Sequence, residues 1–354
     1  MSKRIRVLVV DDSLLLRKAI SKILGEDPGI EVVGAAKDAY EARDMIKQLH
    51  PDVLTLDIEM PGMNGLVFLR NLMRLHPMPV VMVSTHTTQG GEATLEALDI
   101  GAFDVVAKPT GGASLNVQGY GQEIVDKVKA AAQAPVRRLA DLRAAGTMAG
   151  GSVSIGGRKL ADPGRVIAIG ASTGGTEAVR IVLDSLPAEI PGVVITQHIP
   201  GSFSAQFAKR LNASSKLNVK EAEDGEPIKP GHAYVAPGNM HLLVTRSGGV
   251  LRCTLSDGPP VSQHKPSVDV LFESVAKAIG EKAVAVLMTG MGVDGAQGLL
   301  QLRQAGAVTI CQDEKTSVVW GMPGEAVRLG ASERIIPLQK IAEEIISGLV
   351  APRT

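Results

Sequence analysis

The alternation of short β-branched runs with amphipathic stretches restricts the fold of this chain more than any other feature of its sequence. From Ile5 onward, apolar runs rich in valine and isoleucine alternate with segments of helical hydrophobic spacing. Parallel strands need long crossover connections, which helices usually supply, so this order is typical of βαβ units. The alternation fades after Ala132 and resumes at Val166. We therefore predict two α/β domains, which a length of 354 residues accommodates.

Domain boundaries follow from where the alternation stops and returns. Residues 1–132 are predicted to form a flavodoxin-like (βα)5 domain, and residues 164–354 a second doubly wound, mostly parallel α/β domain. Alanine, glycine and arginine dominate residues 133–163, which we interpret as a linker with one short helix at 136–145. Several short strand-like runs follow one another within residues 220–256, so we expect a β-rich insert in the second domain.

Composition argues against several classes of protein. The 37 basic and 37 acidic residues cancel, so no global field attracts nucleic acid or an anionic membrane. The sequence has neither the run of about eighteen apolar residues that spans a bilayer nor a secretory signal at its start. Cys253 and Cys311 lie in apolar strand-like runs, which favours reduced, buried thiols. A cytoplasmic protein is expected, with no nucleic-acid partner and no membrane insertion.

Reactive side chains follow the strands of the first domain, at the carboxyl ends where open parallel sheets bind ligands. The first strand ends at Asp11 and Asp12, the third at Asp57, the fourth at Ser84 and the fifth at Lys108. Neighbouring carboxylates repel unless a cation lies between them, and oxygen ligands suit Mg²⁺. A hydroxyl and an ammonium opposite them would complement a phosphoryl group. Each residue alone is also explained as a helix cap, a turn residue or a solvated charge, but together they favour phosphate chemistry.

Three apolar strands of the second domain also end in reactive side chains, namely Ser172, His198 and Asp294. If the strands are parallel neighbours, these side chains meet as a Ser-His-Asp relay. His198 would take the proton of Ser172, and Asp294 would hold the imidazole in the required tautomer. The glycine-rich turns after Ser172 and around Met291 are candidates for N–H donors to an oxyanion. Asp313, which follows the strand-like run VTICQ, is the second candidate for the acid.

The order of these residues along the chain separates them from two common hydrolase arrangements. Serine, histidine and aspartate follow one another here, whereas α/β-hydrolases have serine, aspartate, histidine and chymotrypsin-like proteases histidine, aspartate, serine. The turn from Gly170 to Gly175 also resembles a nucleotide-binding loop, although Ser172 replaces the central glycine that the pyrophosphate needs. A phosphate-binding loop and a domain that only docks a partner remain the alternatives. No Cys/His spacing matches a zinc site, and His264 follows no predicted strand end, although it could line a pocket.

The first domain resembles the receiver domain of two-component response regulators. The matching residues are Asp11-Asp12, the stretch LDIEMPGMNGL around Asp57, Ser84, and Lys108-Pro109. This resemblance implies that Asp57 is the phospho-acceptor. It also implies an Mg²⁺ site made by Asp12, Asp57 and the main-chain carbonyl of Glu59, with Asp11 in the same acidic cluster.

The same resemblance assigns the remaining receiver residues. It implies that Ser84 is the switch hydroxyl and that Lys108 contacts the phosphate, followed by a cis peptide bond at Pro109. The chain departs from the family pattern at Val105, where an aromatic switch residue is expected. Aromatic rotamer switching therefore does not carry over, whereas the acceptor chemistry does.

The second domain resembles the catalytic domain of the chemotaxis protein-glutamate methylesterases, the CheB family. The matching stretches are IGASTGGTEA, QHIP, YVAPGNMHLLV, HKPSVDVLFESVA, LMTGMGVDGAQGL and QDEKTSVVWGMPGEA. The resemblance implies that Ser172 is the nucleophile, His198 the base and Asp294 the orienting acid. It further implies that the Met291 main chain contributes to the oxyanion hole and that Thr173 lies beside the nucleophile.

Together the two resemblances imply a phosphorylation-regulated esterase of chemotactic adaptation. Its reaction would be hydrolysis of glutamyl methyl esters on chemoreceptors, with deamidation of receptor glutamines. The implied partners are a chemotaxis histidine kinase as phosphodonor and methyl-accepting chemoreceptors as substrate. Mg²⁺ would serve the receiver alone, and the ester hydrolysis would need no cofactor. Our hypothesis is that the unphosphorylated receiver covers Ser172 and that phosphorylation of Asp57 weakens this contact.

Overall fold

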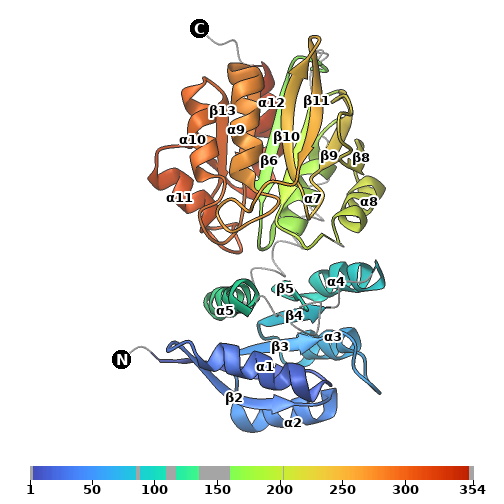
Figure 1. Ribbon diagram of the computed structural model, residues 1–354, viewed down its shortest axis with the longest axis vertical. Helices are drawn as coiled ribbons and strands as arrows, with labels where there is room; N and C mark the ends of the chain where they lie inside the picture. Colours follow the sequence, from blue (N-terminus) through green and yellow to red (C-terminus); the bar gives the residue numbers. More distant parts are fainter. Residues whose placement is uncertain (1–2, 85–87, 109–116, 135–159, 202, 351–354) are drawn as a thin grey trace. The chain divides into compact units, whose positions relative to one another are not determined.

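The computed structural model describes residues 3–84, 88–108, 117–134, 160–201 and 203–350 (Figure 1). These residues form two compact units, Met1–Ala140 and Asp141–Thr354. Pro109, the helix expected at 136–145 and most of the expected linker lie outside the described residues.

The first unit is a five-stranded sheet in the order β2-β1-β3-β4-β5, with every pair parallel. Its strands are β1 (Ile5–Val10), β2 (Ile30–Ala36), β3 (Val53–Asp57), β4 (Val80–Ser84) and β5 (Asp104–Ala107). Its helices are α1 (Leu14–Gly25), α2 (Ala39–Leu49), α3 (Gly65–Leu75), α4 (Thr88–Ile100) and α5 (Val117–Gln133). Helix α1 packs against α5, and α3 packs against α4. This is the predicted flavodoxin-like arrangement.

Strand order in the first unit positions its polar residues. The chain reverses its direction of winding between β1 and β3, which is where doubly wound sheets open a crevice at the carboxyl ends of the strands. Asp11 and Asp12 follow β1, and Asp57 is the last residue of β3. Local capping fixes the start of α1, because the Ser13 hydroxyl accepts a hydrogen bond from the Leu16 N–H. The acidic residues therefore meet at the crevice.

The second unit is a seven-stranded parallel sheet in the order β14-β13-β12-β6-β7-β9-β8. Its strands are β6 (Val166–Ala171), β7 (Gly192–Gln197), β8 (Asn218–Glu221), β9 (His232–Val235), β12 (Ala283–Leu287), β13 (Val308–Gln312) and β14 (Arg334–Ile336). Its helices are α7 (Gly175–Ser185), α8 (Ser204–Ser214), α9 (Val268–Ile279), α10 (Ala296–Gln304), α11 (Met322–Arg328) and α12 (Ile341–Val350). The doubly wound, mostly parallel prediction is confirmed.

The β-rich insert is smaller than the sequence indicated. Only β10 (His241–Ser247) and β11 (Val250–Ser256) form a separate antiparallel hairpin. The two strands before them, β8 and β9, instead extend the main sheet as parallel strands. Gly248 and Gly249 join β10 to β11 with φ angles of 58° and 80°, a conformation that tight hairpin turns require and that glycine adopts without strain.

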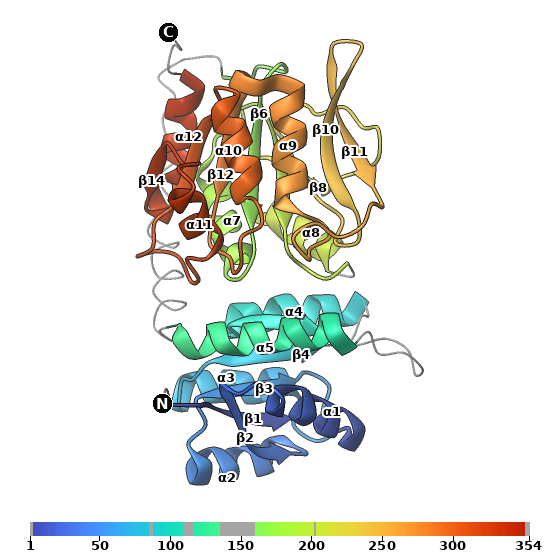
Figure 2. The same cartoon turned by 60° about the vertical axis from the view of Figure 1, so that its left-hand side comes forward.

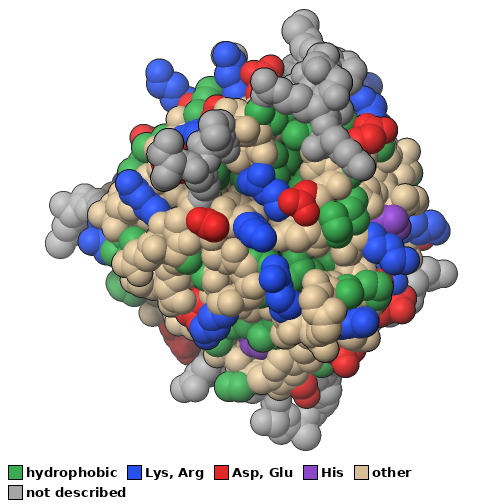
Figure 3. Space-filling model, turned by 90° about the horizontal axis from the view of Figure 1, so that it is seen from above, with side chains coloured by type: hydrophobic (Ala, Val, Ile, Leu, Met, Phe, Trp, Pro, Cys, Tyr) green, Lys and Arg blue, Asp and Glu red, His purple; other side chains and the backbone are tan. Residues whose placement is uncertain are grey.

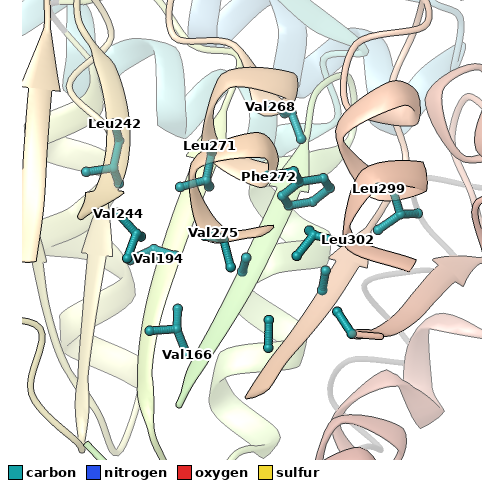
Figure 4. Packing of buried hydrophobic residues seen from close by; sticks show 14 of the residues in the cluster. Val166, Val194, Leu242, Val244, Val268, Leu271, Phe272, Val275, Leu299 and Leu302 are labelled. Carbon is teal, nitrogen blue, oxygen red and sulfur yellow. The ribbon is translucent and has the colours of Figure 1, made fainter. Parts of the chain in front are cut away.

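Helix α9 links the hydrophobic core to the edge of the sheet that carries the candidate site. It lies beside α10 on one face of the sheet and also packs against β10 (Figure 2). Figure 4 shows Val268, Leu271 and Phe272 of α9 pointing into the core that Leu299 and Leu302 of α10 complete. Burying side chains of this size contributes about 1.5–3 kcal/mol each. The packing therefore fixes where the first turn of α9 lies.

The surface and the cysteines agree with the composition. On the face seen in Figure 3, basic and acidic side chains lie among one another. None of the helices in the described part of the chain is both long and apolar enough to cross a bilayer. Cys253 and Cys311 are free and buried, as expected, and burial raises the pKa of each thiol to about 12. The thiols are therefore protonated and unreactive near neutral pH.

Candidate functional site

Three neighbouring strand ends of the second unit converge. Strands β12, β6 and β7 are adjacent in the sheet. Ser172 follows β6, and its N–H donates to the carbonyl of Thr289, which follows β12, at 3.0 Å. His198 follows β7, and its N–H donates to the carbonyl of Ala171 at 3.0 Å. The three strand ends are thus joined by their backbones at one edge of the sheet, as the sequence predicted.

The turn from β6 into α7 presents Ser172. Gly174 has a φ of 75°, and a Cβ at this residue would lie 2.5 Å from Val318, so no larger residue fits without movement. The Ser172 carbonyl accepts hydrogen bonds from the Gly175 N–H at 2.7 Å and from the Gln197 side-chain amide at 2.8 Å. Ser172 remains 9% exposed. Its backbone is therefore fixed, and the residue is largely buried.

His198 and Asp294 are in direct polar contact. The Nε2 atom of His198 lies 2.8 Å from Oδ2 of Asp294, and the side chains are 8% and 0% exposed. The Nδ1 atom of His198 is buried and has no hydrogen-bond partner among the described residues. The serine–histidine hydrogen bond is thus not formed here, which is common in unliganded enzymes. The nitrogen left free for Ser172 is Nδ1, whereas chymotrypsin-type relays leave Nε2 free.

Asp294 is held at the start of α9. Its carboxylate accepts hydrogen bonds from the Ser267 hydroxyl at 2.8 Å, the Val268 N–H at 2.7 Å and the Asp269 N–H at 3.0 Å. Burial opposes the charged form, but the hydrogen bond and charge of His198 and these N–H donors lower the pKa of Asp294 to about 2. The positive end of the helix adds to this effect. Asp294 is therefore ionised at neutral pH.

A second buried carboxyl lies beside Asp294. Asp269 is 5% exposed and accepts a hydrogen bond from the Gly298 N–H at 2.7 Å. Burial and the neighbouring Asp294 raise the pKa of Asp269 to about 6, with burial the larger cause. Of the two adjacent carboxyls, Asp294 therefore keeps its charge at the lower pH, because it has the histidine and the larger set of donors.

The turns after β6 and β12 carry the candidate oxyanion donors. Met291 is half-buried, and its N–H has no acceptor among the described residues. Thr173 is 3% exposed, and its carbonyl accepts a hydrogen bond from the Thr289 hydroxyl at 2.9 Å, which ties the Ser172 turn to the loop after β12.

Asp313, the other candidate acid, instead accepts hydrogen bonds from the N–H and hydroxyl of Thr316 within its own turn.

The first unit gathers its acidic residues in the same way. Asp11 and Asp57 are buried and Asp12 is exposed, and carboxylate oxygens of all three lie within 4.8 Å of one another. The Nζ atom of Lys108 lies 2.7 Å from Oδ2 of Asp57 and 3.2 Å from Oδ2 of Asp11. Several carboxylates at one crevice form the set of hard oxygen donors that Mg²⁺ prefers. The residues present therefore fit a magnesium ion.

Asp57 differs from an ordinary surface aspartate in its protonation. Burial raises its pKa to about 6, because this cause and the charge of Asp11 outweigh the hydrogen bond and charge of Lys108. The only backbone donor in the described contacts of Asp57 is the Glu59 N–H, at 3.2 Å from Oδ1. A further cation at the cluster would favour the ionised carboxylate.

Ser84 is the last residue of β4, and Val105 lies within β5, as the sequence predicted. Ser84 is 1% exposed, and its Oγ accepts a hydrogen bond from the Thr94 hydroxyl of α4 at 3.0 Å. Val105 is buried, and its carbonyl accepts a hydrogen bond from Lys127 of α5 at 2.5 Å. Position 105 thus offers no aromatic ring that could change rotamer, whereas Ser84 has a direct contact with α4.

Comparison with known proteins agrees with this architecture. The family model described as CheB methylesterase matches residues 167–345. A protein-glutamate methylesterase/protein-glutamine glutaminase 1 of Xanthomonas campestris pv. campestris is 54% identical over 346 residues, covering 97% of each chain. The chain belongs to the CheB methylesterase family. A further relative of that name, from Hydrogenovibrio crunogenus, is 51% identical over 97% of this chain and 98% of its own length.

Both units of this CheB-family chain have matches of their own. The response regulator receiver domain model matches residues 7–117. The solved catalytic domain of Thermotoga maritima CheB methylesterase covers 52% of this chain and 97% of its own, with a TM-score of 0.51 and 36% identity.

Sequence reasoning missed the residues that hold Asp294. Ser267 is the N-cap of α9, and its hydroxyl contacts both Asp294 and the Val270 N–H. A serine before an apolar helical run is a recognisable helix start, so the cap itself could have been predicted. The contact with Asp294 could not, because it joins parts of this CheB-family chain that are 27 residues apart.

Proposed function

We propose that this chain is a phosphorylation-regulated protein-glutamate methylesterase that also deamidates glutamines of chemoreceptors. The observation that carries the proposal is the His198–Asp294 pair beside Ser172, in which one imidazole nitrogen is bound by an ionised carboxylate and the other has no partner among the described residues. This is the state that a general base requires. The names of the relatives supply the chemistry, which acts on the methyl ester of a protein glutamate and on a protein glutamine, and the proposed substrate protein is a methyl-accepting chemoreceptor.

The proposed reaction has two steps that share an ester intermediate. Ser172 Oγ attacks the carbonyl carbon of the glutamyl methyl ester, and its proton moves to Nδ1 of His198. The Met291 N–H donates to the oxyanion, and Thr173 lies beside the nucleophile. The C–O bond to methanol then breaks, and methanol leaves with the proton from His198. A glutamyl ester of Ser172 remains.

Water completes the cycle. His198 takes a proton from water, which attacks the glutamyl ester, and the Ser172 alkoxide leaves with that proton. The products are the free glutamate side chain and unmodified Ser172. With a receptor glutamine, ammonia takes the place of methanol in the first step. Asp294 stabilises the imidazolium formed in each step without accepting its proton, which agrees with its low pKa.

We propose that the first unit controls this activity through phosphorylation of Asp57 by a chemotaxis histidine kinase. Asp12, Asp57 and the main-chain carbonyl of Glu59, with Asp11 in the cluster, would hold Mg²⁺, which would neutralise charge at the acceptor. Lys108 and Ser84 are the proposed phosphoryl contacts; Lys108 already lies 2.7 Å from Asp57. The proposed domains are residues 1–132 for the receiver and 164–354 for the esterase, joined by residues 133–163. Receptor helices in the cytoplasm are the proposed site of action.

Methanol release from methyl-labelled receptor membranes tests the activity. The purified full chain should release methanol, and a small phosphodonor with Mg²⁺ should increase the rate. Ammonia should appear when the receptors carry glutamine at the same positions. Ser247→Ala, on the exposed β10–β11 hairpin, is the matched control and should behave as the original chain. Absence of methanol release with and without the phosphodonor would contradict the proposed enzyme.

Removal of the receiver tests the regulation. A chain that begins at about residue 150 should show a higher basal rate and no response to the phosphodonor, because the restraint is gone. An unchanged or lower basal rate would contradict inhibition by the receiver, while methanol release itself would still support the esterase.

A further inference from the structure

His264 stacks on His198. The two imidazole rings lie with their centroids 3.8 Å apart and their planes inclined by 16°. His264 comes from the segment Pro259–Ser267, which leads into α9, and not from a strand end. The ring that Asp294 holds at one edge is thus covered by a second aromatic ring on one face. The relay described above gives His264 no role.

The turn that carries His264 is unusually constrained. Val261 and His264 exchange both backbone hydrogen bonds, at 2.9 and 3.0 Å, around Ser262 and Gln263. Both central residues have positive φ, 50° and 67°, which is the geometry of a tight two-residue hairpin turn that normally favours glycine or asparagine. Backbone strain of this kind persists only where the surroundings enforce it, and it gathers at functional sites.

His241 fastens both ends of this segment. It is 2% exposed, its Nε2 lies 3.0 Å from the Pro259 carbonyl, and its Nδ1 accepts a hydrogen bond from the Ser267 N–H at 3.1 Å. The hydrogen-bond geometry therefore requires the tautomer with the proton on Nε2. Since Ser267 also binds Asp294, the same short segment supports His198 through the acid at its edge and through His264 at its face.

Two contacts of different kinds are needed to fix an imidazole ring. A single hydrogen bond between Nε2 and Asp294 fixes one edge of the His198 ring but leaves rotation about the direction of that bond. Such rotation would swing Nδ1 away from Ser172. A ring stacked at 3.8 Å opposes this rotation, because turning the plane brings the two rings into collision.

We propose that His264 is a positioning residue for the base, which holds the plane of the His198 ring so that Nδ1 keeps the angle that Ser172 requires. The inference rests on the proposed function, in which His198 accepts the serine proton. It extends the relay by a group that touches neither the substrate nor the reacting atoms. A misplaced base can lower the rate of the chemical step by about 100-fold, so the effect should be large enough to measure.

Substitution of His264 in the full chain tests this role through kcat and KM for methanol release. His264→Leu provides a side chain of similar size but removes the ring, and we expect kcat to fall by about 10- to 100-fold with little change in KM. His264→Phe restores a flat ring and should recover most of kcat. His232→Ala is the matched control. His232 is the first residue of β9, at the amino ends of the parallel strands, whereas the site lies at their carboxyl ends, and its ring centroid is 6.2 Å from that of Tyr234.

The outcomes separate the positioning role from the proposed mechanism. An unchanged kcat in His264→Leu overturns the positioning role, and so does an equal loss in His264→Leu and His264→Phe. A rise in KM with unchanged kcat would instead assign His264 to substrate binding and also overturns it. His198→Ala should abolish activity; if it does not, the proposed base is wrong, whatever His264 does. Unfolding curves of each variant show whether a loss reflects the fold.

Discussion

Asp57 and Asp294 both lie at the carboxyl edge of a parallel sheet, are 0% and 1% exposed, and yet have opposite protonation behaviour. Burial raises the pKa of Asp57 to about 6, whereas the His198 contact and the donors around Asp294 overcome burial and lower its pKa to about 2. Both residues lie at or after the end of a strand of a parallel sheet, and their exposure is nearly the same. The difference therefore comes from the number and type of donors that each carboxylate has.

The donor sets match the two proposed roles. The described contacts of Asp57 are Lys108 and one long backbone hydrogen bond, and Asp11 repels its charge. A phosphoryl group can thus be attached to Asp57 without depriving several buried donors of their acceptor. Asp294 is bound by His198, a hydroxyl and two N–H groups of α9, so it stays ionised near neutral pH. These contacts agree with the proposed roles, in which Asp57 accepts a phosphoryl group and Asp294 stays an ionised carboxylate.

The largest expected effect concerns Asp294. Asp294→Asn should lower kcat for methanol release by about 1,000- to 10,000-fold, because the amide favours the wrong tautomer of His198 and does not stabilise the imidazolium. Asp57→Asn, the equivalent change at the other sheet, should leave the basal rate unaltered and remove only the response to phosphodonor. A loss of less than tenfold in Asp294→Asn would show that this carboxylate does not serve the base.

The next effect concerns the stability of the receiver. The raised pKa means that native Asp57 binds a proton more tightly than unfolded Asp57, so its stabilising contribution is complete below about pH 3.8 and is lost as the pH rises through 6. Asp57→Asn should therefore stabilise the receiver at pH 7 by about 3 kcal/mol and have little effect at pH 4. Urea unfolding followed by hydrogen exchange separates the two units. Destabilisation by the substitution at pH 7 would contradict the raised pKa.

Asp294 should show the opposite pH dependence of the unfolding free energy, and the effect should be smaller. Its lowered pKa stabilises the native esterase unit fully above about pH 3.8, and this contribution is lost as the pH falls toward 2. Between pH 4 and pH 2 the original chain should lose about 2 kcal/mol more unfolding free energy in this unit than Asp294→Asn. The same urea experiment measures it. Equal losses in both chains would mean that Asp294 is not held as a carboxylate.

The smallest effect is on magnesium affinity. With a pKa of about 6, Asp57 is mostly protonated at pH 5 and mostly ionised at pH 7. Calorimetric titration should therefore show Mg²⁺ binding up to about tenfold more tightly at pH 7 than at pH 5. In Asp57→Asn most of this difference should disappear. Equal Mg²⁺ affinity of the original chain at both pH values would show that the charge of Asp57 does not control metal binding.

Residues at strand ends were predictable because parallel topology converts positions along the chain into positions in space. Once βαβ alternation indicated a parallel sheet, the polar residues after β6, β7 and β12 had to share one edge. The same argument brought Asp57 and Lys108 together. Ser172, His198 and Lys108 directly follow their strands, which fix them, whereas Asp294 lies in the loop after β12 and is held by the start of α9.

Other features depend on contacts that local pattern does not encode. His264 acts from a loop, where no periodicity fixes the direction of a side chain, and His241 is the first residue of β10; the partners of both come from other segments. Strands β8 and β9 show the same signal as β10 and β11, so sequence could not tell which sheet each joins. Strand β14 has three residues, too few for an alternation to be recognised.

The central claim is that Ser172 forms the bond to the receptor glutamyl group, and removal of its hydroxyl tests this most directly. Methanol release from methyl-labelled receptor membranes should be compared for the original chain, Ser172→Ala and the exposed-surface control Ser247→Ala. The account predicts that Ser172→Ala loses at least about 1,000-fold of the rate, with and without phosphodonor, while the control is unaffected. Retention of a rate close to that of the original chain in Ser172→Ala would contradict the account.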